Sequence, residues 1–134
     1  TIKDLLDSKD YGDVTTIEST RPVIEAAYIM KDQQIGFLIV NIDGAISGVL
    51  SERDIVYKST CAKVSAETQT VAEIMTSEIK WGKPGDNLAT CINILTKARI
   101  RHLPVKDEND HLLGVISQRD ITSFLLNRLT KTKD

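Results

Sequence analysis

Cysteine and histidine are scarce in this chain of 134 residues, which has two of each. Cys61 and Cys91 lack the C-x-x-C spacing and the density of a disulfide framework, so we expect free thiols in a reducing compartment, the cytoplasm. Cys91 falls on the apolar stripe of an expected helix, where a small buried hydrophobe is the simpler interpretation. Two isolated histidines and two distant cysteines do not supply the spaced ligands of a metal site, and we expect no metal.

The chain also lacks an excess of charge of one sign and a long apolar run. Its 17 Lys and Arg against 19 Asp and Glu give a formal charge of −2, which argues against duplex DNA or an anionic membrane as a partner. No apolar run approaches the ~20 residues that span a bilayer, so we expect neither nucleic acid binding nor membrane insertion. The chain begins at Thr1 and not at Met, which is compatible with a trimmed piece of a longer protein.

One motif is present twice. Residues 48–55 (GVLSERDI) return as residues 114–121 (GVISQRDI), about 66 residues further on, a spacing typical of a repeated supersecondary unit. The similarity extends over most of the chain, which we divide into a first repeat at 1–66 and a second at 67–134. Such units pack against their copies, so function is expected between them.

The sequence of each repeat predicts the order β-α-β-β-α in an α/β (α+β) fold. Apolar residues follow helical spacing in some segments, and other segments are short runs rich in β-forming residues. The serine that opens the last helix precedes an aspartate by three residues, as in a capping box. A short helix is expected at 1–6 in the first repeat and at 70–75 in the second, followed by a strand at 14–17 and 79–81 and a helix at 23–31 and 88–97. A hairpin then starts at 35 and 100 and turns at 41–44 and 107–110, and a last helix opens at Ser51 and Ser117.

Residues 102–105 (HLPV) followed by 114–120 (GVISQRD) resemble the cystathionine β-synthase (CBS) domain, and two such domains in tandem resemble a Bateman module. The resemblance implies two repeats packed about a pseudo-twofold axis, with two clefts between them. It also implies an adenosine-containing ligand, such as AMP, ADP, ATP, NAD or S-adenosylmethionine, that acts as a regulator and not as a required cofactor. A homodimer of modules and a regulated enzyme or transporter are the partners it implies.

The motif residues suit a nucleotide on chemical grounds as well. An ionised carboxylate, as in Asp54 or Asp120, offers two acceptor oxygens to the paired hydroxyls of a ribose. Phosphate is bound by hydroxyls, arginines and the N–H groups of a helix start. The simpler interpretation also stays open, in which both aspartates only stabilise helix starts through the helix dipole.

The resemblance assigns the site residues to two shared clefts. The first, cleft A, combines Val49, Ser51, Arg53, Asp54, Ile79, Lys80, Arg101, His102 and Pro104. The second, cleft B, combines Val115, Ser117, Arg119, Asp120, Val14, Thr15, Gly36, Phe37 and Ile39. Because cleft A has Lys80, Arg101 and His102 where cleft B has Thr15, Gly36 and Phe37, we expect phosphate in cleft A.

Several alternatives stay open beside this interpretation. Arg53 and Arg119 are equally compatible with solvated surface charges. His102 has no nucleophile or carboxylate placed beside it by the sequence, so we expect a ligand contact or packing and no enzymatic activity. Pro22 and Asn87 stand where many CBS domains have Ser or Thr that helps to bind phosphate, which argues against tight polyphosphate binding. A structural dimerisation module without a ligand is the alternative function, and the apolar stripe at 121–129 then serves as core or dimer interface.

Overall fold

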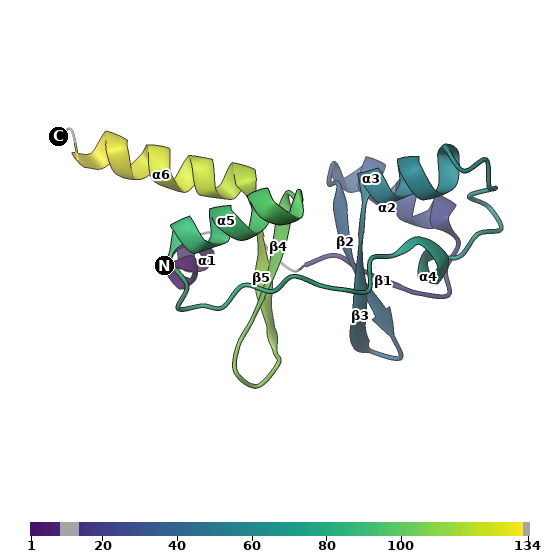
Figure 1. Cartoon of the computed structure of the whole chain (residues 1–134), viewed down its shortest axis with the longest axis horizontal. Helices are drawn as coiled ribbons and strands as arrows, with labels where there is room; N and C mark the ends of the chain where they lie inside the picture. Colours follow the sequence, from purple (N-terminus) through teal and green to yellow (C-terminus); the bar gives the residue numbers. More distant parts are fainter. Residues whose placement is uncertain (9–13, 133–134) are drawn as a thin grey trace. The chain divides into compact units, whose positions relative to one another are not determined.

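Helices and strands follow one another along the chain in the predicted order except for one strand of the second repeat, and the α+β class is confirmed (Figure 1). The computed structural model describes residues 1–8 and 14–132. These residues fall into two compact units: Val14–Ile79 forms one, and the N-terminal segment forms the other together with the chain from Lys80 onwards. We call them the middle unit and the terminal unit.

The middle unit is a three-stranded sheet with helices packed on it. The strand order is β1-β2-β3, with β1 parallel and β3 antiparallel to β2. Its elements are β1 (Thr16–Glu18), α2 (Val23–Gln33), β2 (Phe37–Ile42), β3 (Ala45–Ser51), α3 (Glu52–Ile55), the π-helical turn η1 (Val56–Thr60) and α4 (Val71–Ile74).

The terminal unit is built on one antiparallel hairpin, β4-β5. Its elements are α1 (Ile2–Ser8), α5 (Leu88–Ala98), β4 (His102–Lys106), β5 (Leu112–Ser117) and α6 (Gln118–Thr132). The strand predicted at 79–81 is wrong. Only Gly82 pairs there with β4, donating to the carbonyl of Pro104 at 2.8 Å and accepting from the N–H of Lys106 at 3.3 Å. Pro84 follows shortly and has no N–H for a longer ladder.

The predicted hairpin turns are confirmed at both places. In the middle unit, Asp43 and Gly44 connect β2 to β3 with φ angles of 50° and 84°, the left-handed pair that a two-residue hairpin turn prefers. In the terminal unit, Asp107 closes the turn by accepting N–H groups from Asn109 at 2.8 Å and His111 at 3.0 Å. The two turns have the same function but are held by different means.

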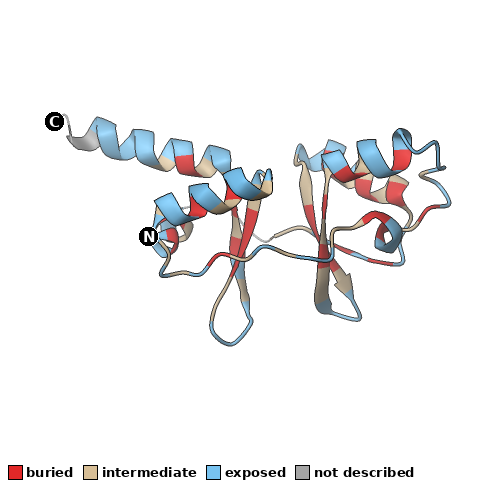
Figure 2. Cartoon of the chain, viewed as in Figure 1, coloured by how far each residue is buried: buried red, intermediate tan, exposed pale blue. Residues whose placement is uncertain are grey.

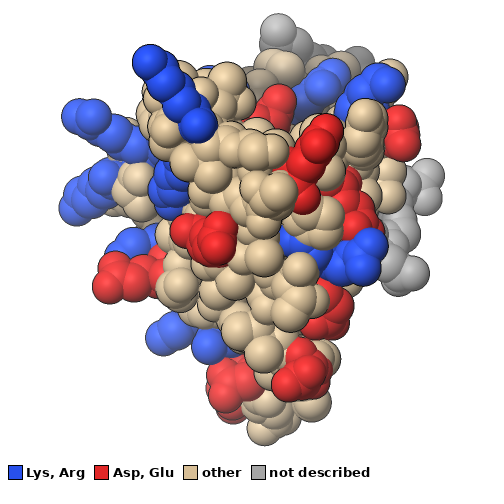
Figure 3. Space-filling model, turned by 90° about the vertical axis from the view of Figure 1, so that its right-hand side faces the viewer, with Lys and Arg blue, Asp and Glu red and all other residues tan. Residues whose placement is uncertain are grey.

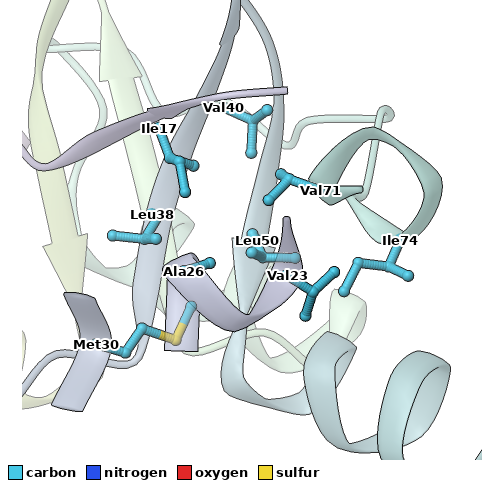
Figure 4. Close-up of a cluster of buried hydrophobic side chains, with 9 residues drawn as sticks. All are labelled: Ile17, Val23, Ala26, Met30, Leu38, Val40, Leu50, Val71 and Ile74. Carbon is cyan, nitrogen blue, oxygen red and sulfur yellow. The ribbon is translucent and has the colours of Figure 1, made fainter. Parts of the chain in front are cut away.

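Each unit has its own hydrophobic core, and the two short helices α1 and α4 complete these cores. The buried side chains of the middle unit (Figure 4) are Ile17, Val23, Ala26, Met30, Leu38, Val40, Leu50, Val71 and Ile74. Those of the terminal unit are Ile2, Leu5, Cys91, Leu95, Leu103, Val105, Ile116 and Ile121. In each unit the buried residues lie on the sides of helices and strands that face one another, while the outer sides of the helices are exposed (Figure 2).

The compact units therefore do not follow the repeat boundaries at 1–66 and 67–134. Ile2 and Leu5 belong to the first repeat by sequence but pack with α5, β4 and β5. Val71 and Ile74 belong to the second repeat but pack with α2, β2 and β3. The repeats have exchanged their short helices, which the motif alignment could not reveal because both helices have similar apolar residues.

Candidate functional site

The most regular polar feature of the chain is a corner where a hairpin strand ends and a helix begins. Ser51 at the end of β3 is the N-cap of α3: its N–H donates to Oδ2 of Asp54 at 3.0 Å, and its Oγ accepts from the N–H of Asp54 at 3.2 Å. The corner after β5 repeats both bonds, at 2.8 Å and 3.0 Å, between Ser117 and Asp120. The predicted capping box is thus present twice. We call these the Asp54 corner and the Asp120 corner.

The Asp54 carboxylate has two further partners in the middle unit. The ammonium of Lys58 lies 3.0 Å from Oδ1. The hydroxyl of Thr76 lies 3.3 Å from Oδ1 and 3.4 Å from Oδ2, and the hydroxyl of Ser51 lies 3.2 Å from Oδ2. Asp54 is buried, with 9% of its surface exposed. A buried charge needs such a set of donors, because its desolvation would otherwise be costly.

The partners of Asp54 are themselves tied to other elements of the middle unit. The Lys58 ammonium also donates to the carbonyl of Ile74 at 3.1 Å, at the end of α4. The backbone of Thr76 pairs with Val49 of β3 through N–H···O bonds of 2.8 Å and 2.9 Å. The carboxylate therefore joins α3, the turn η1, the segment after α4 and β3.

Lys58 and Thr76 were not predicted from the sequence. Lys58 had a usable signal, since it stands four residues after Asp54, a spacing that brings two helical side chains together. Thr76 had none, because its approach depends on where α4 packs.

Beside each corner lies the neighbouring hairpin strand of the same unit. In the middle unit, Phe37 and Ile39 of β2 pair with Ser51 and Val49, and Thr15 accepts the N–H of Ile39 at 3.1 Å. In the terminal unit, His102 and Pro104 pair with Ser117 and Val115. Each of these strand pairs thus places a residue predicted for cleft A opposite a residue predicted for cleft B.

The space beside the first residue of each hairpin differs between the units. Gly36 lies so close to the Glu52 carboxylate that a Cβ at this position would collide with it, and its carbonyl accepts the N–H of Glu52 at 3.0 Å. Arg101 stands at the matching position and accepts the N–H of Gln118 at 3.1 Å. The middle unit thus presents a carboxylate where the terminal unit presents an exposed guanidinium.

All the predicted site residues lie within the described part of the chain, divided between the two units. The middle unit contains Val14, Thr15, Gly36, Phe37, Ile39, Val49, Ser51, Arg53, Asp54 and Ile79. The terminal unit contains Lys80, Arg101, His102, Pro104, Val115, Ser117, Arg119 and Asp120. The assignment to cleft A and cleft B stays a prediction.

The two cysteines differ in burial. Cys91 is fully buried, and burial raises the pKa of its thiol to about 11, with a smaller contribution from Asp86. Cys61 is exposed, and both cysteines are free thiols. Among residues 1–8 and 14–132, His, Cys, Asp and Glu side chains form no group of three that could hold a metal ion.

The helix that precedes each hairpin starts differently in the two units. Pro22 is the N-cap of α2 and forms no side-chain cap bond. Asn87 is the N-cap of α5, and its Oδ1 accepts the N–H of Thr90 at 2.8 Å. Neither residue supplies the hydroxyl that a phosphate would use here.

The surface and the helices bear on the partners that the chain can have. On the face shown in Figure 3, which views the molecule from the right-hand side of Figure 1, acidic and basic side chains are interspersed. None of the helices in the described part of the chain has the length and apolar character needed to cross a lipid bilayer.

Comparison with known proteins identifies the repeats. The CBS domain family model matches residues 2–60 and again residues 71–127. The CBS domain-containing protein YhcV of Bacillus subtilis is 31% identical over 108 residues, which cover 81% of this chain and 76% of that protein. The inosine-5′-monophosphate dehydrogenase of Nitrosopumilus maritimus is 30% identical over 109 residues, but these make up only 21% of its length. Enzymes thus occur among the relatives, and this chain matches only a part of them.

Solved structures show the same fold. A protein with CBS domains from Burkholderia ambifaria has a TM-score of 0.89 at 29% identity, with 94% of this chain and 93% of that chain covered. The CBS domain pair of protein MJ0100, in complex with 5′-methylthioadenosine and S-adenosyl-L-methionine, has a TM-score of 0.79 at 23% identity, with 95% and 96% covered.

Proposed function

This chain belongs to the CBS domain family, and we propose that it is a non-catalytic sensor that binds an adenosine-containing nucleotide through its two corners. It is a tandem CBS-domain protein, the architecture of a regulatory module. The ligand class comprises AMP, ADP, ATP, NAD and S-adenosylmethionine. Occupancy is passed on through a change in how two copies of the chain, or the chain and a regulated partner, pack together.

The repeated corner is the observation that supports this proposal. Each corner gathers a serine, an arginine and an aspartate within four residues at the end of a hairpin strand. A carboxylate suits the hydroxyl pair of a ribose, and a guanidinium suits a phosphate. Arg53 and Arg119 are both exposed. The adenosyl ligands of the MJ0100 domain pair are compatible with this ligand class at the level of the fold.

Calorimetric titration with AMP, ADP, ATP, NAD and S-adenosylmethionine tests the proposal. We expect at least one of them to bind with a dissociation constant below 1 mM, about 4 kcal/mol of binding free energy. Native mass spectrometry of the protein as purified would identify a retained ligand. If none of the five compounds binds below millimolar concentration, the sensor function is refuted.

The phosphate contact is tested separately through Arg101, which is exposed just before β4. We expect Arg101→Ala to weaken AMP binding by about tenfold or more, the effect of one charge-assisted hydrogen bond, and to leave adenosine binding unchanged. An equal loss for adenosine and AMP would refute a phosphate contact at Arg101.

A second candidate function, dimerisation without a physiological ligand, is favoured by α6. Ile121 on this helix is buried, but Leu125, Leu126 and Leu129 are 40%, 57% and 59% exposed. Exposed leucines on one helix suit a protein interface. Sedimentation of the Asp54→Ala/Asp120→Ala variant tests this function: a dimer that persists, together with stability that no nucleotide changes, would favour it over the sensor.

A further inference from the structure

We propose that Glu52 is a specificity-determining residue that keeps phosphate away from the middle unit, so that phosphorylated nucleotides bind beside Arg101 of the terminal unit. The Asp54 corner then takes an adenosyl ligand whose 5′ substituent is cationic, as is the sulfonium of S-adenosylmethionine. The ligands in this inference rest on the proposed function, whereas the difference in phosphate affinity between the units does not. The division follows the units and is independent of the predicted clefts.

Gly36 makes room for the Glu52 side chain. Among the glycines that the structure describes, only Gly44 has a positive φ, so the backbone at Gly36 does not itself require glycine. A Cβ on Gly36 would lie 2.8 Å from Cδ of Glu52, and the N–H of Glu52 donates to the carbonyl of Gly36 at 3.0 Å. The missing side chain at Gly36 thus allows a carboxylate to lie against the start of β2, beside the Asp54 corner.

The terminal unit has the opposite charge on the same backbone arrangement. Arg101 stands where the middle unit has Gly36, and Gln118 stands where it has Glu52. The N–H of Gln118 donates to the carbonyl of Arg101 at 3.1 Å, as in the middle unit, and both residues are exposed. A guanidinium binds phosphate through charge-assisted hydrogen bonds, whereas a carboxylate repels it. The two pairs of residues therefore favour ligands of opposite charge.

The other cations of the corners do not account for this difference. Arg53 and Arg119 stand at the same position in both corners, so their identity does not distinguish the units. The Lys58 ammonium lies 3.0 Å from Oδ1 of Asp54 and donates to the carbonyl of Ile74 at 3.1 Å. Its charge is thus already matched by a carboxylate of the middle unit.

The composition of the units adds a longer-range contribution of the same sign. Residues 14–79 contain nine Asp and Glu against five Lys and Arg, whereas residues 1–13 and 80–134 contain ten against twelve. The summed charge of a domain attracts or repels an ion beyond its direct contacts. A phosphate is therefore repelled by the middle unit as a whole as well as by Glu52.

Backbone amide NMR with inorganic pyrophosphate tests this difference without an adenosine. In the wild type, pyrophosphate should shift the amides around Arg101 and Gln118. The amides around Gly36 and Glu52 should respond only at concentrations about fivefold higher or more, because a carboxylate opposes the anion there. The Gly36→Arg/Glu52→Gln variant carries the residues of the terminal unit and should bring the two half-saturation concentrations within about twofold of each other.

Single substitutions control this experiment. Glu52→Gln removes the charge, keeps the shape and should recover part of the response of the middle unit; it replaces the double variant if that variant does not fold. Glu67→Gln removes another exposed carboxylate of the middle unit and should change nothing. Raising the salt concentration from about 50 mM to about 500 mM should reduce the difference between the units, because exposed charges are screened.

Three results of the pyrophosphate titration would overturn the proposal. The first is an equal response of both units in the wild type, and the second is a wild type in which neither unit responds. The third is a middle unit that responds as weakly in the folded Gly36→Arg/Glu52→Gln and Glu52→Gln variants as in the wild type.

Calorimetry with AMP and S-adenosylmethionine separates this inference from the proposed function. Glu52→Gln should weaken S-adenosylmethionine binding by about threefold or more and leave AMP binding within about twofold. If no nucleotide binds, the sensor fails, and pyrophosphate still distinguishes the units. If nucleotides bind but Glu52→Gln affects neither or both equally, or if AMP binds and S-adenosylmethionine does not, the sensor stands and the ligand assigned to the Asp54 corner is refuted.

Discussion

The middle and terminal units hold the same corner with different support. In both, the serine N–H donates to the aspartate three residues later, at 3.0 Å in the Asp54 corner and 2.8 Å in the Asp120 corner. In the middle unit the ammonium of Lys58 and the hydroxyl of Thr76 also contact the carboxylate of Asp54. A capping box is encoded within four residues, so duplication preserves it. The surroundings of the carboxylate come from other segments, which can diverge.

The short helices α1 and α4, which the repeats have exchanged, should give the largest effects on the stability of the two units. We expect Leu5→Ala to destabilise the terminal unit and Ile74→Ala the middle unit, each by about 2–5 kcal/mol, because both side chains are almost fully buried. Hydrogen exchange followed by mass spectrometry would locate the change. Leu5→Ala should speed exchange in β4 and β5, and Ile74→Ala in β2 and β3.

The same measurement can contradict the exchange of the short helices between the repeats. If Leu5→Ala sped exchange mainly in β2 and β3, each short helix would stabilise its own sequence repeat. Exposed Leu126 offers a matched control: Leu126→Ala removes the same atoms without opening a cavity, and should change the free energy of unfolding by less than about 0.5 kcal/mol.

The glycines that open the two motifs should differ in a second way. A Cβ on Gly48 would lie 2.9 Å from the carbonyl oxygen of Thr76, a backbone atom, whereas a Cβ on Gly114 would lie 2.9 Å from Cδ2 of Leu6, the end of a flexible side chain. We expect Gly48→Ala to cost about 1–3 kcal/mol and Gly114→Ala less than about 1 kcal/mol. Urea unfolding of both variants measures the difference. A larger loss for Gly114→Ala than for Gly48→Ala would contradict this difference between the backbone contact and the side-chain contact.

Much of this organisation could be predicted from the sequence. The helices over 23–31 and 88–97, the hairpins and the capping boxes depend on local patterns and are all present. The family follows from the duplicated motif. The strand predicted at 79–81 is absent. The apolar residues of this segment suggested a strand, but Pro84 cannot extend the pairing of Gly82 with β4.

The parts that escaped prediction depend on contacts between distant segments. The apolar patterns of α1 and α4 are similar. Neither pattern therefore predicts which of the two cores its helix will complete. The contact between Thr76 and Asp54 follows from that exchange, because α4 brings Thr76 to β3. The roles of the corner residues therefore depend on tertiary structure, whereas their conformation does not.

The cysteines offer a third contrast between the units, at alkaline pH. Burial raises the pKa of Cys91 to about 11 from an ordinary value of 9.0. Because the folded pKa is the higher one, this stabilisation is complete below pH 9 and is lost as the pH rises through about 11, by up to roughly 2 kcal/mol. Urea unfolding at pH 8 and pH 11 should show a smaller alkaline loss for Cys91→Ala than for wild type. Cys61→Ala, at an exposed site, should keep the full loss; an unchanged loss in Cys91→Ala would refute the assignment.

The hairpin turns should give the smallest difference, at acid pH. The pKa of Asp107 is lowered, chiefly because its carboxylate accepts the backbone N–H of His111 and also that of Asn109. A lowered folded pKa stabilises the protein above the ordinary value of 3.8, and this contribution is lost as the pH falls through the folded pKa. Asp107→Asn should therefore reduce the loss of stability between pH 5 and pH 2 slightly. Gly44→Ala, which places a Cβ at a φ of 84°, should instead lower the free energy of unfolding by about 1 kcal/mol at every pH. Urea midpoints across this pH range therefore distinguish a turn held by charge from a turn held by backbone conformation.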